Sequence, residues 1–370
     1  MYAHRLSRLS GLIAPIGVDA LLVTNPKDVG YLTGFLGGDS YLLVPAGKDG
    51  PTLISDFRYM EELAPVQESG IARLHIRTRS MTDALVEVLG SAKDKVVWER
   101  VGIQAEHMTI AEKAAIGRKL GAGGGKRLAD TFGLVSRLRV VKDAHEVGLI
   151  RKAAKIQEQA LAAVLPTIRA GQTELEVAAA IECEMKKRGS SEPGFQTIVA
   201  AGANSSLPHY RPSAKKIGAN KPLLIDWGAV YKGYHSDMTR TYAVGKWPAK
   251  LREVYKAVLE AQEMAAGALA PGKTTAEVDA VARKHIGAHG YAEFFGHGLG
   301  HGIGLSGHED PRLTNMLAPT RLEAGMVVTV EPGVYLPGVG GVRIEDDYVI
   351  TERGAENLCT MGKGMEQFGA

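Results

Sequence analysis

The chain has 370 residues, of which 45% are hydrophobic and 23% are charged, as in ordinary globular proteins. This composition excludes a disordered, collagen-like or membrane-spanning chain, and at roughly 150 residues per domain the length indicates about two domains. The formal net charge of +3 is spread without a long basic run, so we expect no nucleic-acid and no membrane partner.

The cysteine content indicates a reducing setting. Cys183 and Cys359 are the two cysteines, too few for a disulfide framework or a cysteine-rich zinc module. The first apolar stretch is short and is broken by Pro15 and Gly17, so we expect no secretory leader. These features together predict a cytoplasmic protein.

The first part of the chain alternates helix-like and strand-like segments. A helix is expected near the start, and strands at 19–25, 40–46 and 51–57. A helix-like segment at 82–92 and a strand-like segment at 95–103 follow. The alternation predicts one α/β domain.

A long helix is expected after a stretch rich in arginine and lysine, 136–143. Its apolar residues recur at spacings of three and four, at Leu149, Ala153, Ile156, Ala160 and Val164. We therefore expect the domain boundary near residue 138.

One segment of the second domain recurs at an offset of 101 residues. The sequence GQTELEV at 171–177 recurs as GKTTAEV at 272–278, and each copy contains a T-x-x-E capping box that begins a helix. Each helix then ends at a glycine, Gly189 or Gly290. Capping boxes are common, but the shared offset favours a duplication. We expect two similar halves about an approximate two-fold axis, with the site in a groove between them.

Two strand-like segments, 223–230 and 234–244, flank the turn 231–233 and predict a β-hairpin. If the hairpin is symmetric about the 231/232 bond, Asp226 lies directly opposite Asp237, with Cβ atoms about 4.5–5.5 Å apart. Two carboxylates so placed are destabilising unless a proton or a cation lies between them. A bulge that shifts the register, or a turn role for one aspartate, is the alternative.

The second half supplies matching groups. The segment 297–304, HGLGHGIG, is too glycine-rich for a helical HExxH zinc motif, so we expect His301 on an extended, closely approached backbone. The segment 326–331 is an apolar strand that ends in a glutamate, Glu331. In a further segment, 342–350, alternation predicts three side chains on one face: Arg343, Glu345 and Asp347.

Taken singly, each of these residues is more often a turn, surface or core residue than a ligand. Together, one imidazole and four carboxylates form an oxygen-rich set. Such a set suits two divalent ions, manganese, cobalt or zinc, bridged by carboxylates, rather than a single structural zinc.

Six strings, in order, resemble the signature of the pita-bread metallopeptidases, in the branch of Xaa-Pro dipeptidase (prolidase) and Xaa-Pro aminopeptidase: IDWG, SDMTR, HGLGHGIGL, HE-x-PR, TVEPGVY and RIED. The resemblance covers the whole chain and implies an α+β architecture. It implies a creatinase/prolidase-like N-terminal α/β domain over 1–137 and a pita-bread catalytic domain with a pseudo-two-fold repeat over 138–370. It also implies a homodimer.

The resemblance implies a role for each metal-binding position. Asp226 chelates a first metal, Asp237 and Glu345 bridge both metals, and His301 and Glu331 bind the second. The related creatinase shares the fold, needs no metal and lacks this complete set, so its chemistry is disfavoured.

Two such metals would lower the pKa of a shared water and polarise the peptide carbonyl. Glu331 is then expected to shuttle the proton. The family pattern implies that His308 and His209 stabilise the oxyanion. It also implies that His297 lines the pocket for the proline, and that two residues support the ligands: Tyr335 and Arg343.

Substrate preference depends on one further residue. Arg312, in the string HEDPR, matches the arginine that holds the free carboxylate of a dipeptide in several prolidases, although a solvated loop arginine is the alternative. We therefore expect an Xaa-Pro dipeptidase that acts on short proline-containing peptides. An Xaa-Pro aminopeptidase on longer peptides and an inactive binding module of the same fold are the competing hypotheses.

Overall fold

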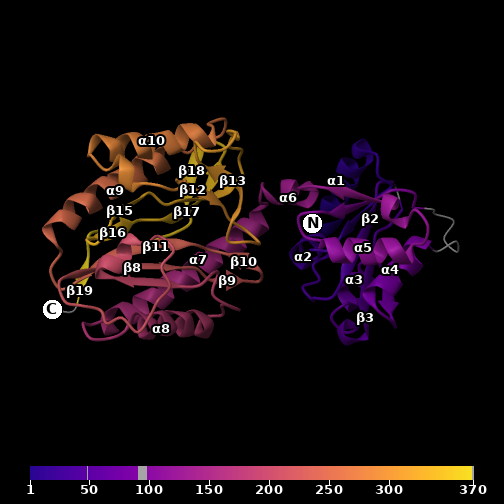
Figure 1. Ribbon diagram of the computed structural model, residues 1–370, viewed down its shortest axis with the longest axis horizontal. Coiled ribbons are helices and arrows are strands. Elements are labelled where there is room, and N and C mark those ends of the chain that lie inside the picture. The colour runs from indigo at the N-terminus through magenta and orange to yellow at the C-terminus, as the bar shows by residue number, and fades with distance from the viewer. Residues whose placement is uncertain (48, 91–97, 369–370) are drawn as a thin grey trace. The chain divides into compact units, whose positions relative to one another are not determined.

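The computed structural model describes residues 1–47, 49–90 and 98–368 (Figure 1). The chain divides into two compact units, Met1–Arg139 and Val140–Ala370. The sequence predictions for 82–92 and 95–103 fall partly on residues 91–97, which lie outside the described residues.

A mixed six-stranded sheet forms the centre of the first unit, in the order β4-β3-β2-β1-β5-β6. The strands are β1 (Ala20–Val23), β2 (Tyr41–Pro45), β3 (Thr52–Asp56), β4 (Arg73–Arg77), β5 (Val101–Gln104) and β6 (Leu128–Thr131). The helices are α1 (Tyr2–Ile13), α2 (Pro26–Thr33), α3 (Ala64–Glu68), α4 (Met81–Gly90), α5 (Ile110–Lys119) and α6 (Leu134–Arg139). The first helix and the first three strands confirm the sequence prediction.

Four long helices and several sheets form the second unit. The helices are α7 (Ala144–Val164), α8 (Glu174–Lys187), α9 (Ala249–Ala268) and α10 (Thr275–Ala288). One sheet has the order β19-β11-β8-β7 and the other β13-β12-β14-β17-β18, and two strand pairs, β9-β10 and β15-β16, accompany them. No helix in the described part of the chain is both long and apolar enough to cross a membrane.

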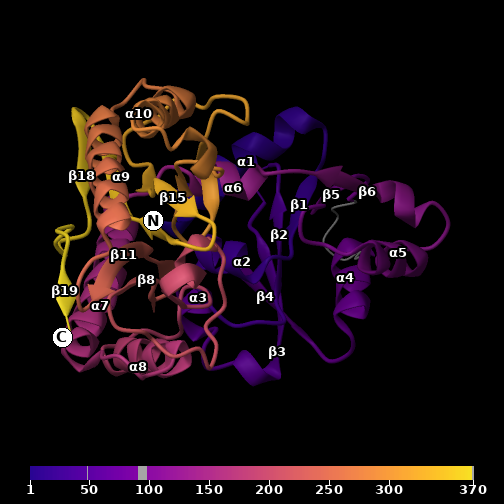
Figure 2. The ribbon, with the colours of Figure 1, turned by 60° about the vertical axis from the view of Figure 1, so that its left-hand side comes forward.

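The strands of the second unit are β7 (Ile198–Ala201), β8 (Lys221–Trp227), β9 (Val230–Tyr231), β10 (Tyr234–His235), β11 (Met238–Val244), β12 (Gly300–Gly302), β13 (Glu309–Leu313), β14 (Val327–Val330), β15 (Gly333–Leu336), β16 (Gly340–Arg343), β17 (Asp346–Thr351), β18 (Gly354–Asn357) and β19 (Gln367–Phe368). In Figures 1 and 2, α8 and α10 lie on opposite sides of these strands.

The internal repeat is visible in the backbone. Both capping boxes form, at the starts of α8 and α10. Gly171 N donates to the carbonyl of Ile217 at 2.9 Å, and Gly272 N donates to the carbonyl of Leu322 at 2.8 Å. The duplicated sequence therefore builds two similar halves, each a helix pair with its own strands.

Each half has its own hydrophobic core. Trp227 is fully buried among the residues of α7, α8 and β7, and its Nε1 donates to the carbonyl of Gln157 at 2.9 Å. Val278, Leu251 and Ile286 pack in the core of the other half. Burying each large apolar side chain contributes about 1.5–3 kcal/mol, so the two cores hold the strand ends between them in place.

The hairpin forms, but its register differs from the prediction. Asp226 on β8 pairs with Thr239 on β11, not with Asp237. The two turn residues are Lys232 and Gly233, both with positive φ (49° and 83°), so the hairpin centre lies one residue further along the chain than a centre at the 231/232 bond. The residue opposite Asp226 is therefore two positions further along than predicted. Because side chains alternate between the faces of a strand, a shift of two positions keeps the same face toward the site.

The segment 342–350 is not one strand. It is divided between β16, which pairs with β15, and β17, which pairs with β14 and β18. The prediction that Arg343, Glu345 and Asp347 share one strand face was therefore wrong. Glu345 lies in the break between the two strands, which explains how its carboxylate reaches a different region from that of Asp347.

Candidate metal centre

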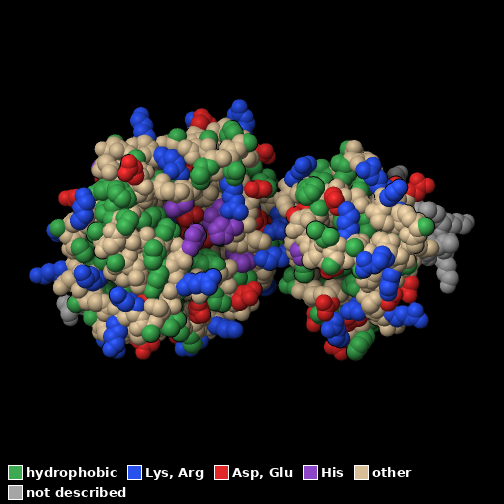
Figure 3. All heavy atoms as spheres, in the orientation of Figure 1, with side chains coloured by type: hydrophobic (Ala, Val, Ile, Leu, Met, Phe, Trp, Pro, Cys, Tyr) green, Lys and Arg blue, Asp and Glu red, His purple; other side chains and the backbone are tan. Residues whose placement is uncertain are grey.

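A cavity of about 640 Å³ lies in the second unit, and histidine side chains gather around the hollow in Figure 3. Ten residues proposed from the sequence line it: His209, Asp226, Asp237, His297, His301, His308, Arg312, Glu331, Arg343 and Glu345. Tyr335 contacts this group through the His297 imidazole, with its hydroxyl 2.9 Å from Nε2. Asp347 is not among the residues that line this cavity.

Within the cavity, three side chains that can bind metals lie close together, and they come from both halves of the second unit. One ligand atom from each of Asp237, His301 and Glu345 lies within 4.8 Å of the other two. His301 Nε2 is also 3.4 Å from Glu331 Oε1 and 3.8 Å from Asp237 Oδ2. Residues more than a hundred positions apart in the sequence therefore meet at one point.

The backbone around His301 explains the glycines of the motif. A Cβ atom at Gly300 would lie 2.1 Å from the carbonyl oxygen of Thr329, and one at Gly302 would lie 2.1 Å from that of Asp310. Strand β12 is thus pressed between β14 and β13, and glycine on both sides of His301 permits this approach.

Four carboxylates crowd the cavity. Burial raises the pKa of Asp237 well above its ordinary value, and the Glu345 and Asp226 carboxylates raise it further. Burial likewise raises the pKa of Glu345 well above its ordinary value, and Glu331 adds to it. Burial raises the pKa of Glu331 to about 8. Carboxylates that repel one another in a buried site need protons or cations, so the donor set fits divalent metal ions.

Asp226 supplies a second test of this fit. Its Oδ2 accepts a hydrogen bond from Arg343 NH2 at 2.6 Å, whereas among the described residues no group hydrogen-bonds its buried Oδ1. A buried acceptor without a donor is costly, and a cation would satisfy it. Burial raises the pKa of Asp226, and Arg343 opposes this.

His301 is oriented for coordination. Its Nδ1 lies 3.1 Å from the carbonyl oxygen of Gly302, so Nδ1 donates and the lone pair of Nε2 faces the carboxylates. Burial, together with the neighbouring His308, lowers the pKa of His301 to about 3. The two rings lie 3.9 Å apart. The imidazole is therefore neutral, as a metal ligand must be.

Arg343 and Tyr335 form a support beneath the cavity. Arg343 NH1 donates to the Tyr335 hydroxyl at 2.8 Å, and burial raises the pKa of Tyr335 to about 12. Burial and the Arg343 charge lower the pKa of His297 to about 4. A neutral His297 therefore borders the cavity, and the Tyr335 hydroxyl holds its ring in place.

Two polar contacts to the candidate ligands were missed by the sequence reasoning. Thr239 Oγ1 donates to Glu345 Oε2 at 2.6 Å and accepts from Arg343 Nε at 2.9 Å. Asp347 Oδ2 accepts from Asp237 N at 3.0 Å. The available signal for Thr239 was its position in the string SDMTR, two residues after Asp237 on a buried strand.

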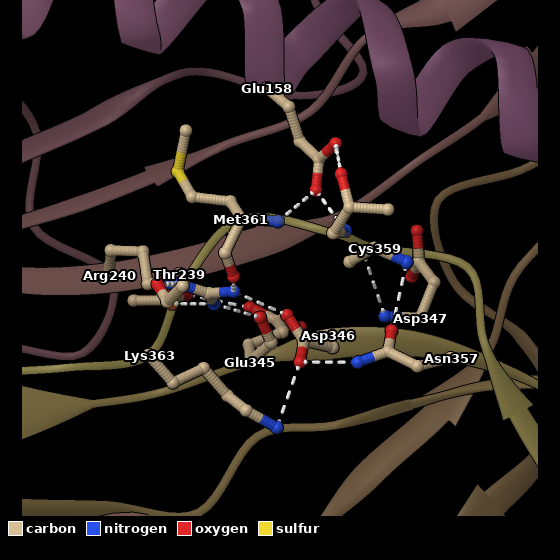
Figure 4. A network of polar contacts seen from close by, with 12 residues as sticks. Glu158, Thr239, Arg240, Glu345, Asp346, Asp347, Asn357, Cys359, Met361 and Lys363 are labelled. Carbon is tan, nitrogen blue, oxygen red and sulfur yellow. Dashed lines mark hydrogen bonds and ion pairs between the residues drawn. The ribbon is translucent and has the colours of Figure 1, made fainter.

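A buried polar network lies behind the Glu345 position (Figure 4). Arg240 donates to the carbonyl oxygen of Glu345 at 2.7 Å and to Asp346 Oδ1 at 2.6 Å. Asp346 Oδ2 also accepts from Asn357 at 2.9 Å and pairs with Lys363 at 3.2 Å. This network fixes the backbone at the break between β16 and β17.

The loop that carries His209 is held by one buried carboxylate. Glu174, the first residue of α8, accepts hydrogen bonds from Ala201 N and from the side chains of Asn204 and Tyr210, at 2.8–2.9 Å. Ser213 donates to the same side chain through its backbone N and its hydroxyl. Both ends of the loop are therefore anchored, and His209 between them faces the cavity.

The repeat, the convergent carboxylates and the glycine-framed histidine define a metallopeptidase with the pita-bread fold. The chain belongs to metallopeptidase family M24, which matches residues 148–352, and its first part matches the Creatinase/Prolidase N-terminal domain over residues 5–141. It is accordingly a metal-dependent peptidase, as the sequence analysis predicted.

Known relatives cover the chain almost completely. It is 37% identical over 357 residues to the Xaa-Pro dipeptidase of Pyrococcus furiosus, covering 96% of this chain and 97% of that one. An Xaa-Pro dipeptidase structure from Bacillus anthracis matches with a TM-score of 0.93 and 36% identity over 100% of both chains. An X-Pro aminopeptidase structure from Thermotoga maritima matches with a TM-score of 0.86 and 34% identity over 98% of this chain and 100% of that one.

Proposed function

We propose that the chain is an Xaa-Pro dipeptidase (prolidase) that uses two divalent metal ions. One observation carries the proposal: five ligand-type side chains from both halves of the repeat converge in a cavity that Arg312 also lines. Relatives named Xaa-Pro dipeptidase, in sequence and in structure, support it.

In this proposal, Asp226 would hold one ion, His301 and Glu331 would hold the other, and Asp237 and Glu345 would contribute to both positions. The oxygen-rich set with a single imidazole suits manganese, cobalt or zinc. When bound, such ions supply a water of lowered pKa and polarise the peptide carbonyl.

The protein's own side chains would handle protons and charge. Glu331, which lines the cavity 3.4 Å from His301 Nε2, would accept a proton and deliver it to the leaving nitrogen. His308 and His209, both lining the cavity, would donate to the developing oxyanion. His297, held by Tyr335, would border the proline side of the substrate.

Arg312 would bind the free carboxylate of a dipeptide. It lies on β13 directly opposite His301 on β12, one strand from the proposed ligands. Arg312 also lines the cavity, and a guanidinium can clamp a carboxylate with two parallel hydrogen bonds. Apolar side chains at the same cavity, Phe195, Met316 and Leu317, offer a surface for a proline ring, whose amide nitrogen has no hydrogen to donate.

The test compares an Ala-Pro dipeptide with an Ala-Pro-Ala tripeptide, using metal-stripped protein to which manganese, cobalt or zinc is added back. We expect faster cleavage of the dipeptide, and no cleavage without metal. Arg312→Met should raise KM for Ala-Pro about 10- to 100-fold, because a charge-assisted pair is lost. Arg211→Met, at another cavity-lining arginine, is the comparison, and an equal rise in KM there would indicate a general effect of charge on the cavity rather than a clamp by Arg312.

The likeness to an X-Pro aminopeptidase structure favours a second candidate, cleavage of the same bond in longer peptides. Equal or faster cleavage of Ala-Pro-Ala, with no effect of Arg312→Met, would select this alternative. No cleavage of either peptide with any metal would favour an inactive binding module. A homodimer and a cytoplasmic location remain predictions, and sedimentation of the purified protein tests the first.

A further inference from the structure

A second group of ligand-type side chains lies on the helices of the second half. Glu260 on α9 meets His285 in the last turn of α10 and His289 just after it. One ligand atom from each residue lies within 4.8 Å of the other two. This group shares no residue with the cavity lining, and Glu260 and His289 are exposed to solvent.

The two histidines are spaced to act together. They are four residues apart at the end of one helix, so their side chains lie on the same face, with ring centroids 4.5 Å apart. Glu260 reaches them from α9, which packs against α10 (Figure 2). A pair of histidines one helical turn apart is a bidentate arrangement for transition metals.

The hydrogen bonding of His289 fixes which nitrogen is available. Its Nδ1 lies 3.0 Å from the carbonyl oxygen of His285. A carbonyl can only accept, so Nδ1 carries the hydrogen and Nε2 keeps its lone pair. Histidines that bind metals are oriented in this way, with the second ring nitrogen donating to a backbone carbonyl or carboxylate.

His285 and Glu260 are already in contact. His285 Nε2 lies 2.9 Å from Glu260 Oε2, where the two atoms share a proton. A cation that takes the place of this proton, releasing it to the buffer, would move the two atoms apart by only a few tenths of an ångström, since zinc binds each at about 2.0–2.2 Å. Two imidazoles and one carboxylate form a set that suits zinc, nickel or copper better than magnesium, calcium or manganese.

We propose that Glu260, His285 and His289 form a surface binding site for a transition metal such as zinc, separate from the catalytic cavity. A cation there joins α9 to the end of α10. Arg283, in the same turn of α10, donates to the backbone carbonyls of Phe295 and His297, which lead into the cavity lining. The site therefore stabilises the helix end from which the His297 segment continues.

The first experiment uses the untagged full-length protein on resin with immobilised copper, because resin-bound copper cannot enter a buried site. We expect retention, and elution at a clearly lower imidazole concentration for His285→Ala and for His289→Ala. His145→Ala is the matched control, since His145 is an exposed helical histidine without a second histidine one turn away. Elution of His289→Ala together with the wild type would overturn the proposal and leave a simple ion pair between Glu260 and His285.

The second experiment measures zinc binding in solution by thermal shift, with excess manganese present throughout. Zinc that replaces manganese in the catalytic cavity does so equally in wild type and variants, so their difference reports the surface group. We expect zinc affinity to fall at least about tenfold in His289→Ala, because even groups that only support metal ligands are worth about 10- to 100-fold. Identical zinc titrations of wild type, His289→Ala and His145→Ala would contradict the site.

Discussion

The carboxylate of Glu174 accepts a hydrogen bond from the Tyr210 hydroxyl at 2.8 Å, at the buried start of α8. Tyr210 directly follows His209, so this contact sets the position of the residue proposed to stabilise the oxyanion. The equivalent position of the second half is Thr275, whose hydroxyl accepts from Thr320 N at 3.1 Å. The repeat thus uses a carboxylate in one half where it uses a hydroxyl in the other.

Tyr210→Phe should therefore lower kcat as well as the free energy of unfolding. The Tyr210 hydroxyl contacts Asn204 and Ser213 as well as Glu174, and each lost hydrogen bond costs about 1 kcal/mol of stability. A small misplacement of a catalytic group can cost up to about 100-fold in rate. We expect at least a tenfold fall in kcat on Ala-Pro, measured beside thermal unfolding. Thr275→Val, at the equivalent position of the second half, is the control, with a smaller stability loss and unchanged kcat. A Tyr210→Phe enzyme with full kcat would refute the positioning role.

Thr239 is predicted to set the metal affinity of the centre. Thr239→Val removes the hydroxyl that joins Glu345 to Arg343, and loss of such a support for a metal ligand weakens binding about 10- to 100-fold. Thr241→Val, two residues along the same strand, removes a hydroxyl that contacts only the backbone of Arg343 among the described residues. Metal titration of both stripped variants should show the loss in Thr239→Val alone. Equal affinities would show that the hydroxyl has no such role.

Much of the fold followed from local sequence patterns. Capping boxes and closing glycines are local signals, so both repeat helices formed where expected. The hairpin register was missed because it depends on which two residues take positive φ, and a lysine at φ 49° is not signalled by its side chain. The face toward the site was nevertheless right, since a shift of two residues preserves it.

The convergence of the proposed ligands could be anticipated from the sequence, but the residues that support them could not. Asp226, His301 and Glu331 each end or lie within apolar strands, where a polar side chain needs a reason to be buried. The contacts of Thr239 and Arg240 depend instead on how β11 meets the break between β16 and β17. Alternation through 342–350 gave no sign of this break, because it is a feature of tertiary structure.

The raised pKa of Glu331 should make the stability of the metal-free protein depend on pH. Its pKa is raised from 4.5 to about 8 in the folded state. Between these values the folded chain holds a proton that the unfolded chain has released, so stability falls as pH rises from about 4.5 to about 8. Glu331→Gln should reduce this fall, as measured by thermal unfolding of the stripped protein across the range.

The same variant tests catalysis once metal is restored. Removing a general base costs about 100- to 10,000-fold in rate, so Glu331→Gln should lose at least 100-fold in kcat.

Bound metal keeps the carboxylates ionised, so the fall in stability with pH should shrink in the loaded wild-type protein. A stripped Glu331→Gln protein with the pH dependence of the wild type would contradict the assignment of this slope to Glu331.

Asp346 is predicted to be essential for stability although it does not line the cavity of the proposed metal centre. It is buried and faces two cations, Arg240 and Lys363 (Figure 4). Asp346→Asn leaves the buried guanidinium of Arg240 without its counter-charge, and breaking such a pair costs about 3–5 kcal/mol. Glu356→Gln is the matched control, because its pair with Arg151 is 54% and 45% exposed and worth at most about 1 kcal/mol. Urea unfolding of the metal-loaded proteins distinguishes Asp346→Asn from Glu356→Gln.

The same substitution should also weaken metal binding, because Arg240 holds the carbonyl of Glu345. An Asp346→Asn variant that loses neither stability nor metal affinity would show that the network does not position Glu345.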